Sequence, residues 1–65
     1  MKFVELHRMA DGEPIYINPF NIDYIVKKQK SEATIVRTTS NVYVREAPDE
    51  IMKLIDSVIT VAYYG

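Results

Sequence analysis

The residues of this 65-residue chain that could do chemistry are one histidine and a few carboxylates. Glu5 and His7 alternate along a predicted strand, so both lie on the same strand face and can form a solvent-side pair. Glu46, Asp49 and Glu50 lie at a predicted helix start, where the helix dipole favours negative charge without any catalytic role. Catalysis needs three groups fixed around one cleft, and one small sheet with one helix is expected to leave little volume for a cleft of about 300 Å³ or more. We therefore predict no catalytic residue and no enzymatic activity.

Metal ions and cofactors are not expected either. The chain has no cysteine, which excludes disulfides and thiolate ligands. Its single histidine, His7, cannot build a metal site unless several carboxylates converge on it. No glycine-rich phosphate loop is present. We predict a protein without a metal or a cofactor.

A second group of residues combines cations with aromatic rings. The cations, which surround one end of the third predicted strand or lie on its neighbours, are Lys27, Lys28, Lys30, Arg37 and Arg45. Tyr16, Tyr24 and Tyr43 can share a sheet face with some of them. Rings flanked by cations stack single-stranded bases, at roughly 1–3 kcal/mol per base. This pattern predicts the alternative function, a single-stranded nucleic-acid-binding or transcription-regulatory module.

The charge balance weakens that alternative. The formal net charge is −1, with 8 basic and 9 acidic residues, so the whole molecule does not attract nucleic acid or an anionic membrane. Lysines also protect exposed sheet edges against aggregation. That role explains the lysines at 27–30 without a ligand.

The same tyrosines fit a protein interface. The strands predicted over 22–28 and 33–39 are apolar at consecutive positions, which suggests burial on both faces, and one helix covers only one face. Tyrosine suits interface cores because it joins a large apolar body to a polar handle. The uncovered face holds Tyr16, Tyr24, Ile35 and Tyr43. We predict that it contacts a second copy of the chain, in a homo-oligomer, or another protein.

The fold that must position these residues is a small α+β domain over residues 1–65. Alternating apolar residues predict strands over 3–8, 15–17, 22–28, 33–39 and 42–46. Asp11-Gly12 suits the first turn, and a bend at 18–21 tucks Phe20 under the sheet. We expect a mostly antiparallel sheet of four to five strands, covered on one face by a single C-terminal helix.

The predicted helix begins near Pro48, a residue suited to the first helical position. Its buried stripe is predicted to be Ile51, Leu54, Ile55 and Val58. A chain of this length buries only about 60% of the surface that its unfolded state exposes. Self-association is the support that remains without disulfides or metals. The role of the apolar end, 61-VAYYG-65, stays open between a frayed helix end and a docking segment.

The apolar runs are too short to span a membrane, and the beginning, MKFVELHR, lacks the core of a signal peptide. We therefore expect a cytoplasmic protein without membrane insertion.

The runs 15-IYINPFNIDYI-25 and 42-VYVREAPDEIMKLI-55, with the strand between them, resemble the small bacterial flagellar proteins of the FlbD type. The resemblance covers about residues 3–59: a hairpin, an Asn-bearing bend, a strand pair and a helix with an acidic start. It implies a cytoplasmic accessory role in motility and no catalytic residues. Ala47 departs from the polar cap usual in such proteins, and a phage-borne relative on the same scaffold would show the same pattern.

Overall fold

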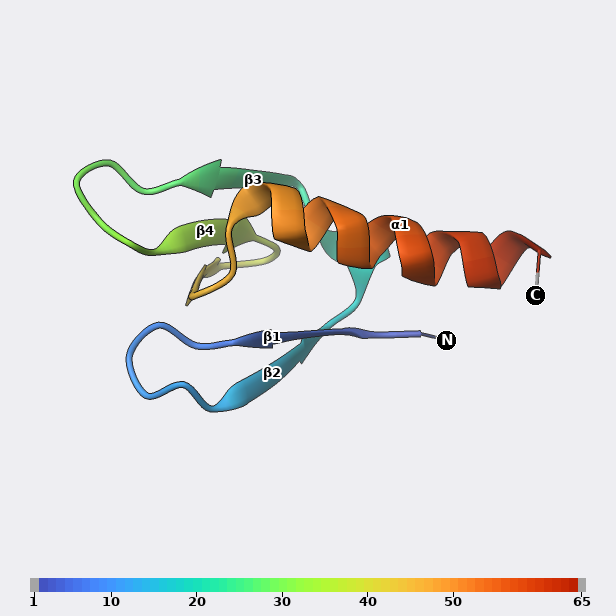
Figure 1. The fold of residues 1–65 in the computed structure, drawn as a ribbon, viewed down its shortest axis with the longest axis horizontal. Coiled ribbons are helices and arrows are strands. Elements are labelled where there is room, and N and C mark those ends of the chain that lie inside the picture. Colours follow the sequence, from blue (N-terminus) through green and yellow to red (C-terminus); the bar gives the residue numbers. More distant parts are fainter. Residues whose placement is uncertain (1, 65) are drawn as a thin grey trace.

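The computed structural model describes residues 2–64, and the side chains of residues 2–59. In chain order the elements are β1 (Val4–His7), β2 (Pro14–Ile17), the 3-10 helix η1 (Pro19–Asn21), β3 (Tyr24–Lys27), β4 (Thr34–Arg37), β5 (Asn41–Val44) and α1 (Pro48–Tyr64) (Figure 1). The prediction of an α+β fold with antiparallel strands and one C-terminal helix is confirmed. The strands form two sheets: β1 pairs with β2, and β4 lies between β3 and β5.

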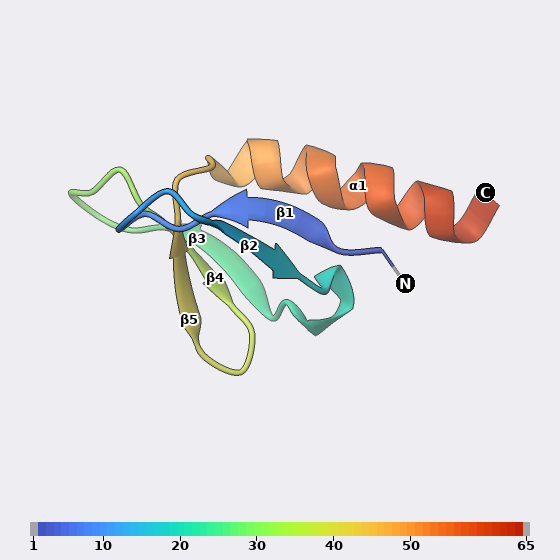
Figure 2. The ribbon, with the colours of Figure 1, turned by 90° about the horizontal axis from the view of Figure 1, so that it is seen from below.

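The two sheets meet where the end of β1 runs beside the end of β5. Arg8 and Val44 form an isolated antiparallel bridge, and the Arg45 N–H donates to the His7 carbonyl at 2.8 Å. These contacts connect the strands in the order β2, β1, β5, β4 and β3. The five strands therefore curve around one interior instead of lying flat (Figure 2).

The inward side chains follow from the strand register. Val4 is paired with Ile17 and Leu6 with Ile15, so the predicted inward faces of the first two strands are confirmed. The buried core consists of Val4, Leu6, Ile17, Val36, Val44 and Ile51. Residues of both sheets and of α1 therefore share one small core.

The helix α1 covers the opening between the two sheets by packing against β1 and β3 (Figures 1 and 2). It begins at Pro48, as predicted, and the Ile51 N–H donates to the Ala47 carbonyl at 3.0 Å. Ile51 is fully buried, but Leu54 is 37% exposed. The predicted stripe is therefore too wide: at about 100° per residue, Leu54 points roughly 60° away from Ile51 and lies at the flank of the contact.

The bend before β3 also differs from the prediction. Phe20 is 58% exposed rather than tucked under the sheet, and Pro19 is buried in its place. The reason is local: the Asn18 side chain accepts a hydrogen bond from the Phe20 N–H at 3.0 Å. This cap turns η1 so that its proline faces the interior.

Residues 61–64 of the apolar end continue α1, whereas their side chains and Gly65 lie outside the described residues. Across the part of the chain that is described, no helix combines the length and apolar character needed to cross a membrane.

One buried polar group generates a stability prediction. Thr34 is fully buried, and its hydroxyl has no hydrogen-bond partner among the described residues. Thr34→Val keeps the shape and removes the unpaired hydroxyl, so we expect the free energy of unfolding to rise by about 1 kcal/mol. Urea denaturation measures the change, with Thr39→Val in an exposed turn as the control. A destabilised Thr34→Val variant would show that the hydroxyl has a partner.

Candidate functional site

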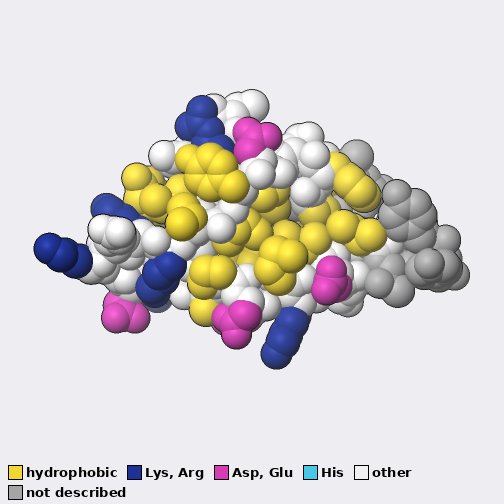
Figure 3. Space-filling model, turned by 90° about the horizontal axis from the view of Figure 1, so that it is seen from above, with side chains coloured by type: hydrophobic (Ala, Val, Ile, Leu, Met, Phe, Trp, Pro, Cys, Tyr) yellow, Lys and Arg dark blue, Asp and Glu magenta, His cyan; other side chains and the backbone are white. Residues whose placement is uncertain are grey.

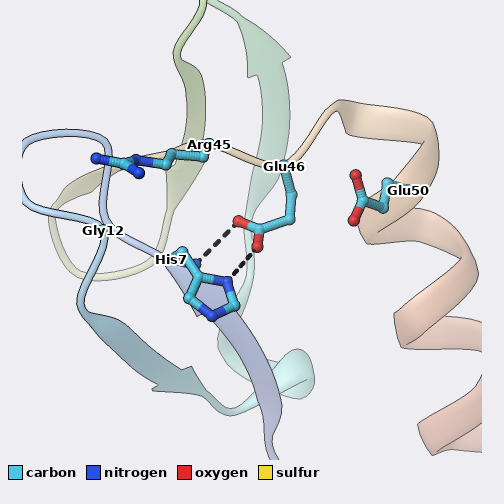
Figure 4. A pocket seen from close by; sticks show the side chains of 5 residues that line it. All are labelled: His7, Gly12, Arg45, Glu46 and Glu50. Atoms are coloured by element: carbon cyan, nitrogen blue, oxygen red, sulfur yellow. Dashed lines mark hydrogen bonds and ion pairs between the residues drawn. The ribbon is translucent and has the colours of Figure 1, made fainter.

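A polar pocket of about 320 Å³ opens where β1 meets the link between β5 and α1 (Figure 4). It is lined by His7, Gly12, Arg45, Glu46 and Glu50. His7 is the last residue of β1, Arg45 and Glu46 follow β5, and Glu50 belongs to the first turn of α1. The pocket thus brings together residues from two segments that are distant in sequence, 7–12 and 45–50.

Glu46 is the residue that ties these parts together. Its Oε1 accepts the His7 N–H at 2.9 Å, and its Oε2 lies 2.6 Å from Nδ1 of the His7 ring. The Glu46 side chain is only 10% exposed. Glu5 adds a second carboxylate, 3.4 Å from Nε2 of the ring. The Glu46 carboxylate therefore binds both the main-chain N–H and the side chain of His7, and so connects the end of β1 to the segment that precedes α1.

These contacts shift the pKa values of both partners. The hydrogen bond to Glu46 raises the pKa of His7 above its usual 6.5, against an opposing effect of partial burial, and the negative charges of Glu46 and Glu5 raise it further. Burial alone would raise the pKa of Glu46, but the hydrogen bonds from the ring and the N–H of His7 outweigh it, so this pKa falls below its usual 4.5. The pair is therefore an ion pair over a mildly acidic range.

Gly12 and Arg45 form the other wall of the pocket. The Arg45 guanidinium donates to the Met9 carbonyl from Nε at 3.4 Å and from Nη2 at 3.3 Å. Gly12 has φ +75°, and a Cβ at this position would lie 2.8 Å from Nη1 of Arg45. The glycine thus serves both the turn and the close approach of the arginine. The β1–β2 hairpin is held against the residues that follow β5.

The polar contacts of this pocket are made between its own lining residues and their neighbours. The expected Glu5–His7 pair is present, and both sides of the His7 ring are occupied by carboxylates. Among the described residues, no group of three or more metal-ligating side chains could hold a metal ion. The sequence reasoning missed the Glu46–His7 contact because 39 positions separate the partners. One sequence feature could have indicated it. Glu46 lies before the helix, which begins at Pro48, so the helix dipole does not explain its negative charge as it does for Asp49 and Glu50.

The second candidate site is the outer face of the three-stranded sheet, defined here as Tyr24, Val26, Ile35 and Tyr43. The register sets Ile35 between Val26 on one side and Tyr43 on the other, and Tyr24 lies two residues before Val26, hence on the same side. Tyr24, Val26 and Tyr43 are 50%, 46% and 41% exposed. Figure 3 shows hydrophobic side chains gathered in the middle of the molecular face that carries β3 and α1.

Tyr16 does not belong to this face. It lies on β2 of the other sheet, directly opposite Glu5, and is well exposed there. The prediction that all four interface residues share one face is therefore wrong for Tyr16. The reason is the division into two sheets, which turns the outer side of β2 away from the outer face.

The structure does not bring the five predicted cations together. Lys27 donates to the Glu32 carbonyl at 3.0 Å, Arg37 donates to the Asn41 side chain at 3.2 Å, and Lys30 lies in the β3–β4 turn with φ 58°. Lys28 and Arg37 border the outer face by alternation and register. Lys27 alternates to the other side of β3, and Arg45 lies in the polar pocket.

Comparisons with known proteins add no relative: the chain matches no family model, no curated protein and no solved structure. The resemblance to FlbD-type proteins therefore stays a prediction from the sequence pattern.

The Glu46–His7 contact predicts how stability changes with pH. Because the pKa of folded His7 is raised, its contribution is complete below about pH 6.5 and is lost as the pH rises through the raised value. Because the pKa of folded Glu46 is lowered, its contribution is complete above about pH 4.5 and is lost on further acidification. The free energy of unfolding contributed by this pair is therefore greatest between these limits.

Glu46→Gln should lower the free energy of unfolding and flatten this pH dependence above pH 6.5, because the charge that stabilises protonated His7 is gone. The pKa of His7, followed by NMR titration of its ring, should fall towards its usual value of 6.5. Glu50→Gln, in the same pocket but without a bond to His7, is the matched control. An unchanged His7 titration in Glu46→Gln would contradict the assignment.

Proposed function

We propose that the protein is a non-catalytic interaction module that self-associates through its outer face. The observation that supports this most directly is the alignment of Tyr24, Val26, Ile35 and Tyr43 on the side of the sheet turned away from the core. A solvated sheet face is normally polar, and large exposed apolar patches mark interaction sites.

The small core is the second reason. Six hydrophobic side chains make up the buried cluster, whereas eight large hydrophobic residues among those described are exposed. A domain of this size is only marginally stable on its own. Burying the outer face against another molecule contributes a stabilising free energy of about 25 cal/mol per Å² of apolar surface removed from water.

A second copy of the chain is the partner that we favour. The outer face has an apolar centre, and its ends are bordered by Lys28 and Arg37, the arrangement of an interface core with a polar rim. Identical patches meet most simply across a two-fold axis. Sheets packed face to face accommodate β-branched and aromatic side chains such as those of Ile35 and Tyr43.

The cellular role that we propose is accessory, in motility or in a phage-related system, and cytoplasmic. It is supported by the resemblance of residues 3–59 to FlbD-type proteins and by no other observation.

Single-stranded nucleic acid is the alternative occupant of the outer face, because Tyr24 and Tyr43 share it with Lys28 and Arg37. Self-association is favoured because the Lys28 ammonium lies 5.0 Å from the centroid of the Tyr43 ring. It therefore occupies a ring face on which a base would stack. Two of the predicted cations are also bound away from the outer face: Lys27 donates to the Glu32 carbonyl and Arg45 to the Met9 carbonyl.

Ile35→Asp and Tyr43→Asp should each lower the molar mass of the assembled protein by about half, since a two-fold contact joins two copies and a carboxylate at its centre would be desolvated. Light scattering coupled to size-exclusion chromatography measures the mass. Phe20→Asp is the control, because Phe20 is an exposed aromatic residue, at 58% against 41% for Tyr43, that lies on η1 and is not part of the outer face.

A parent protein that stays monomeric, or a mass that Phe20→Asp lowers as much as Ile35→Asp does, would contradict the proposal. Retention of a fluorescent oligo-dT that weakens with salt, and with Lys28→Glu and Arg37→Glu, would instead support the nucleic-acid alternative.

A further inference from the structure

The strand order leaves one sheet edge without a covering element. In the order β2, β1, β5, β4 and β3, the two outer strands are β2 and β3. β3 packs against α1, whereas β1 lies between α1 and β2 in both Figure 1 and Figure 2. The helix therefore does not cover the outer edge of β2. Such an edge presents main-chain donors and acceptors to which another strand can be added.

A neutral groove of about 310 Å³ runs along this edge, apart from the polar pocket and the outer face. Residues 15–18 all line it. Because successive side chains of a strand point to opposite faces, a cavity that touches four consecutive residues follows the edge of the strand. Thr38, Thr39 and Val42 lie on its other side, and its lining contains no charged residue. A strand that enters the groove therefore desolvates no ion there.

The hydrogen bonds of β1 show which main-chain groups of β2 point to this edge. His7 is paired with Pro14. Its N–H donates to Glu46 at 2.9 Å and its C=O accepts the Arg45 N–H at 2.8 Å, so both groups point away from β2. Along an antiparallel pair, bonded and non-bonded residue pairs alternate. The main-chain groups of Pro14 and Tyr16 therefore both point to the open side of β2.

The hydrogen-bonding groups that remain free at this edge form a short series. Tyr16 offers its N–H and its C=O, and Pro14 offers only its C=O. Asn18, which continues the strand in an extended conformation with φ −72° and ψ 114°, offers only its N–H. Its C=O already accepts the Asn21 N–H at 3.0 Å. None of the groups offered here has a partner among the described residues.

We propose that β2 pairs antiparallel with β2 of a second copy of this chain, about a two-fold axis at Tyr16. Tyr16 then exchanges both of its main-chain hydrogen bonds with Tyr16 of the partner subunit. The Asn18 N–H donates to the C=O of the partner subunit's Pro14, and the symmetric bond forms at the other end. The N–H that proline lacks is not needed, because the Asn18 carbonyl opposite it is already bound. Every free group of the edge therefore finds its complement in a second copy.

The side chains match in the same register. Ile15 lies opposite the partner subunit's Ile17 on the core side, and within one chain Ile17 is buried in the core and Ile15 packs against it. On the other side Tyr16, which is 59% exposed in the single chain, lies opposite Tyr16 of the partner subunit, and aromatic cross-strand pairs stabilise a sheet. Proline on an edge strand normally hinders pairing, but Pro14 removes no donor that this register uses.

This contact gives Tyr16 an interface role on a different surface from the one predicted from sequence. It uses none of the outer-face residues and does not rest on self-association through that face. Two separate two-fold contacts on each chain build an assembly larger than a dimer. The edge contact is therefore isolated by studying it in the Ile35→Asp protein, in which the outer-face contact is removed.

Tyr16→Pro removes the N–H at the centre of the proposed pairing. Proline is accepted on an edge strand where its nitrogen faces solvent, so pairing with β1 is kept. Tyr16→Val is the matched control, because valine also lacks the ring but keeps the N–H and suits a strand. In the Ile35→Asp protein, light scattering coupled to size-exclusion chromatography should show a dimer with Tyr16→Val and about half that molar mass with Tyr16→Pro. Circular dichroism checks that each variant folds.

A disulfide tests the register independently, since the chain has no cysteine of its own. Opposite residues of a hydrogen-bonded pair have Cα atoms about 5.5 Å apart, within the roughly 4.4–6.8 Å that a disulfide requires. In a glutathione buffer, Tyr16→Cys should therefore give several-fold more disulfide-linked dimer than Glu13→Cys. Glu13 is exposed on the same hairpin, but the register separates its two copies by about 20 Å along the strands.

Equal molar masses for Tyr16→Pro and Tyr16→Val, or no excess of disulfide-linked dimer from Tyr16→Cys over Glu13→Cys, would overturn the proposal. A monomeric Ile35→Asp protein would also overturn it, since the edge then holds a different occupant or none. If Ile35→Asp leaves the mass of the parent unchanged while Tyr16→Pro lowers it, the outer-face contact is wrong and the edge contact stands. The two contacts therefore fail in distinguishable ways.

Discussion

The constraint on which this structure depends is the size of its core. Six buried hydrophobic side chains must hold together two sheets and a helix. A core of this size is too small for each sheet to have its own, so both sheets and the helix pack their apolar side chains at the place where they meet. The helix contributes Ile51 to the core, β1 and β2 contribute Val4, Leu6 and Ile17, and the three-stranded sheet contributes the rest. Additional stability comes from the polar contacts at the junction and, in our proposal, from covering the outer face with a second copy.

Residues 43–45 show how closely these requirements are combined. Tyr43 lies on the outer face, Val44 is fully buried in the core, and Arg45 reaches across to the Met9 carbonyl. The Met9 N–H in turn donates to the Tyr43 carbonyl at 2.9 Å. The β1–β2 hairpin is therefore fastened to the same short segment that positions the outer face. Changes at the Glu46–His7 contact should alter the order of this hairpin before they affect the rest of the three-stranded sheet.

The sequence was sufficient for the elements but not for their arrangement. Period-two alternation correctly assigned Val4 and Leu6 to the interior, and Pro48 marked the helix start, because both signals are local. The way in which the two sheets meet depends on the bridge between Arg8 and Val44, for which neither segment carries a local signal. Tyr16 was misplaced for this reason. The Glu46–His7 contact was missed likewise, since it joins residues 39 positions apart.

The central claim, that association of copies of this chain stabilises a domain with a small core, is tested most directly by the dependence of the thermal midpoint on protein concentration. Association stabilises the folded state by mass action. Differential scanning calorimetry over about two orders of magnitude in concentration should therefore give a midpoint that rises steadily. A midpoint that is the same at every concentration would show that the isolated chain is stable by itself, and would contradict the account.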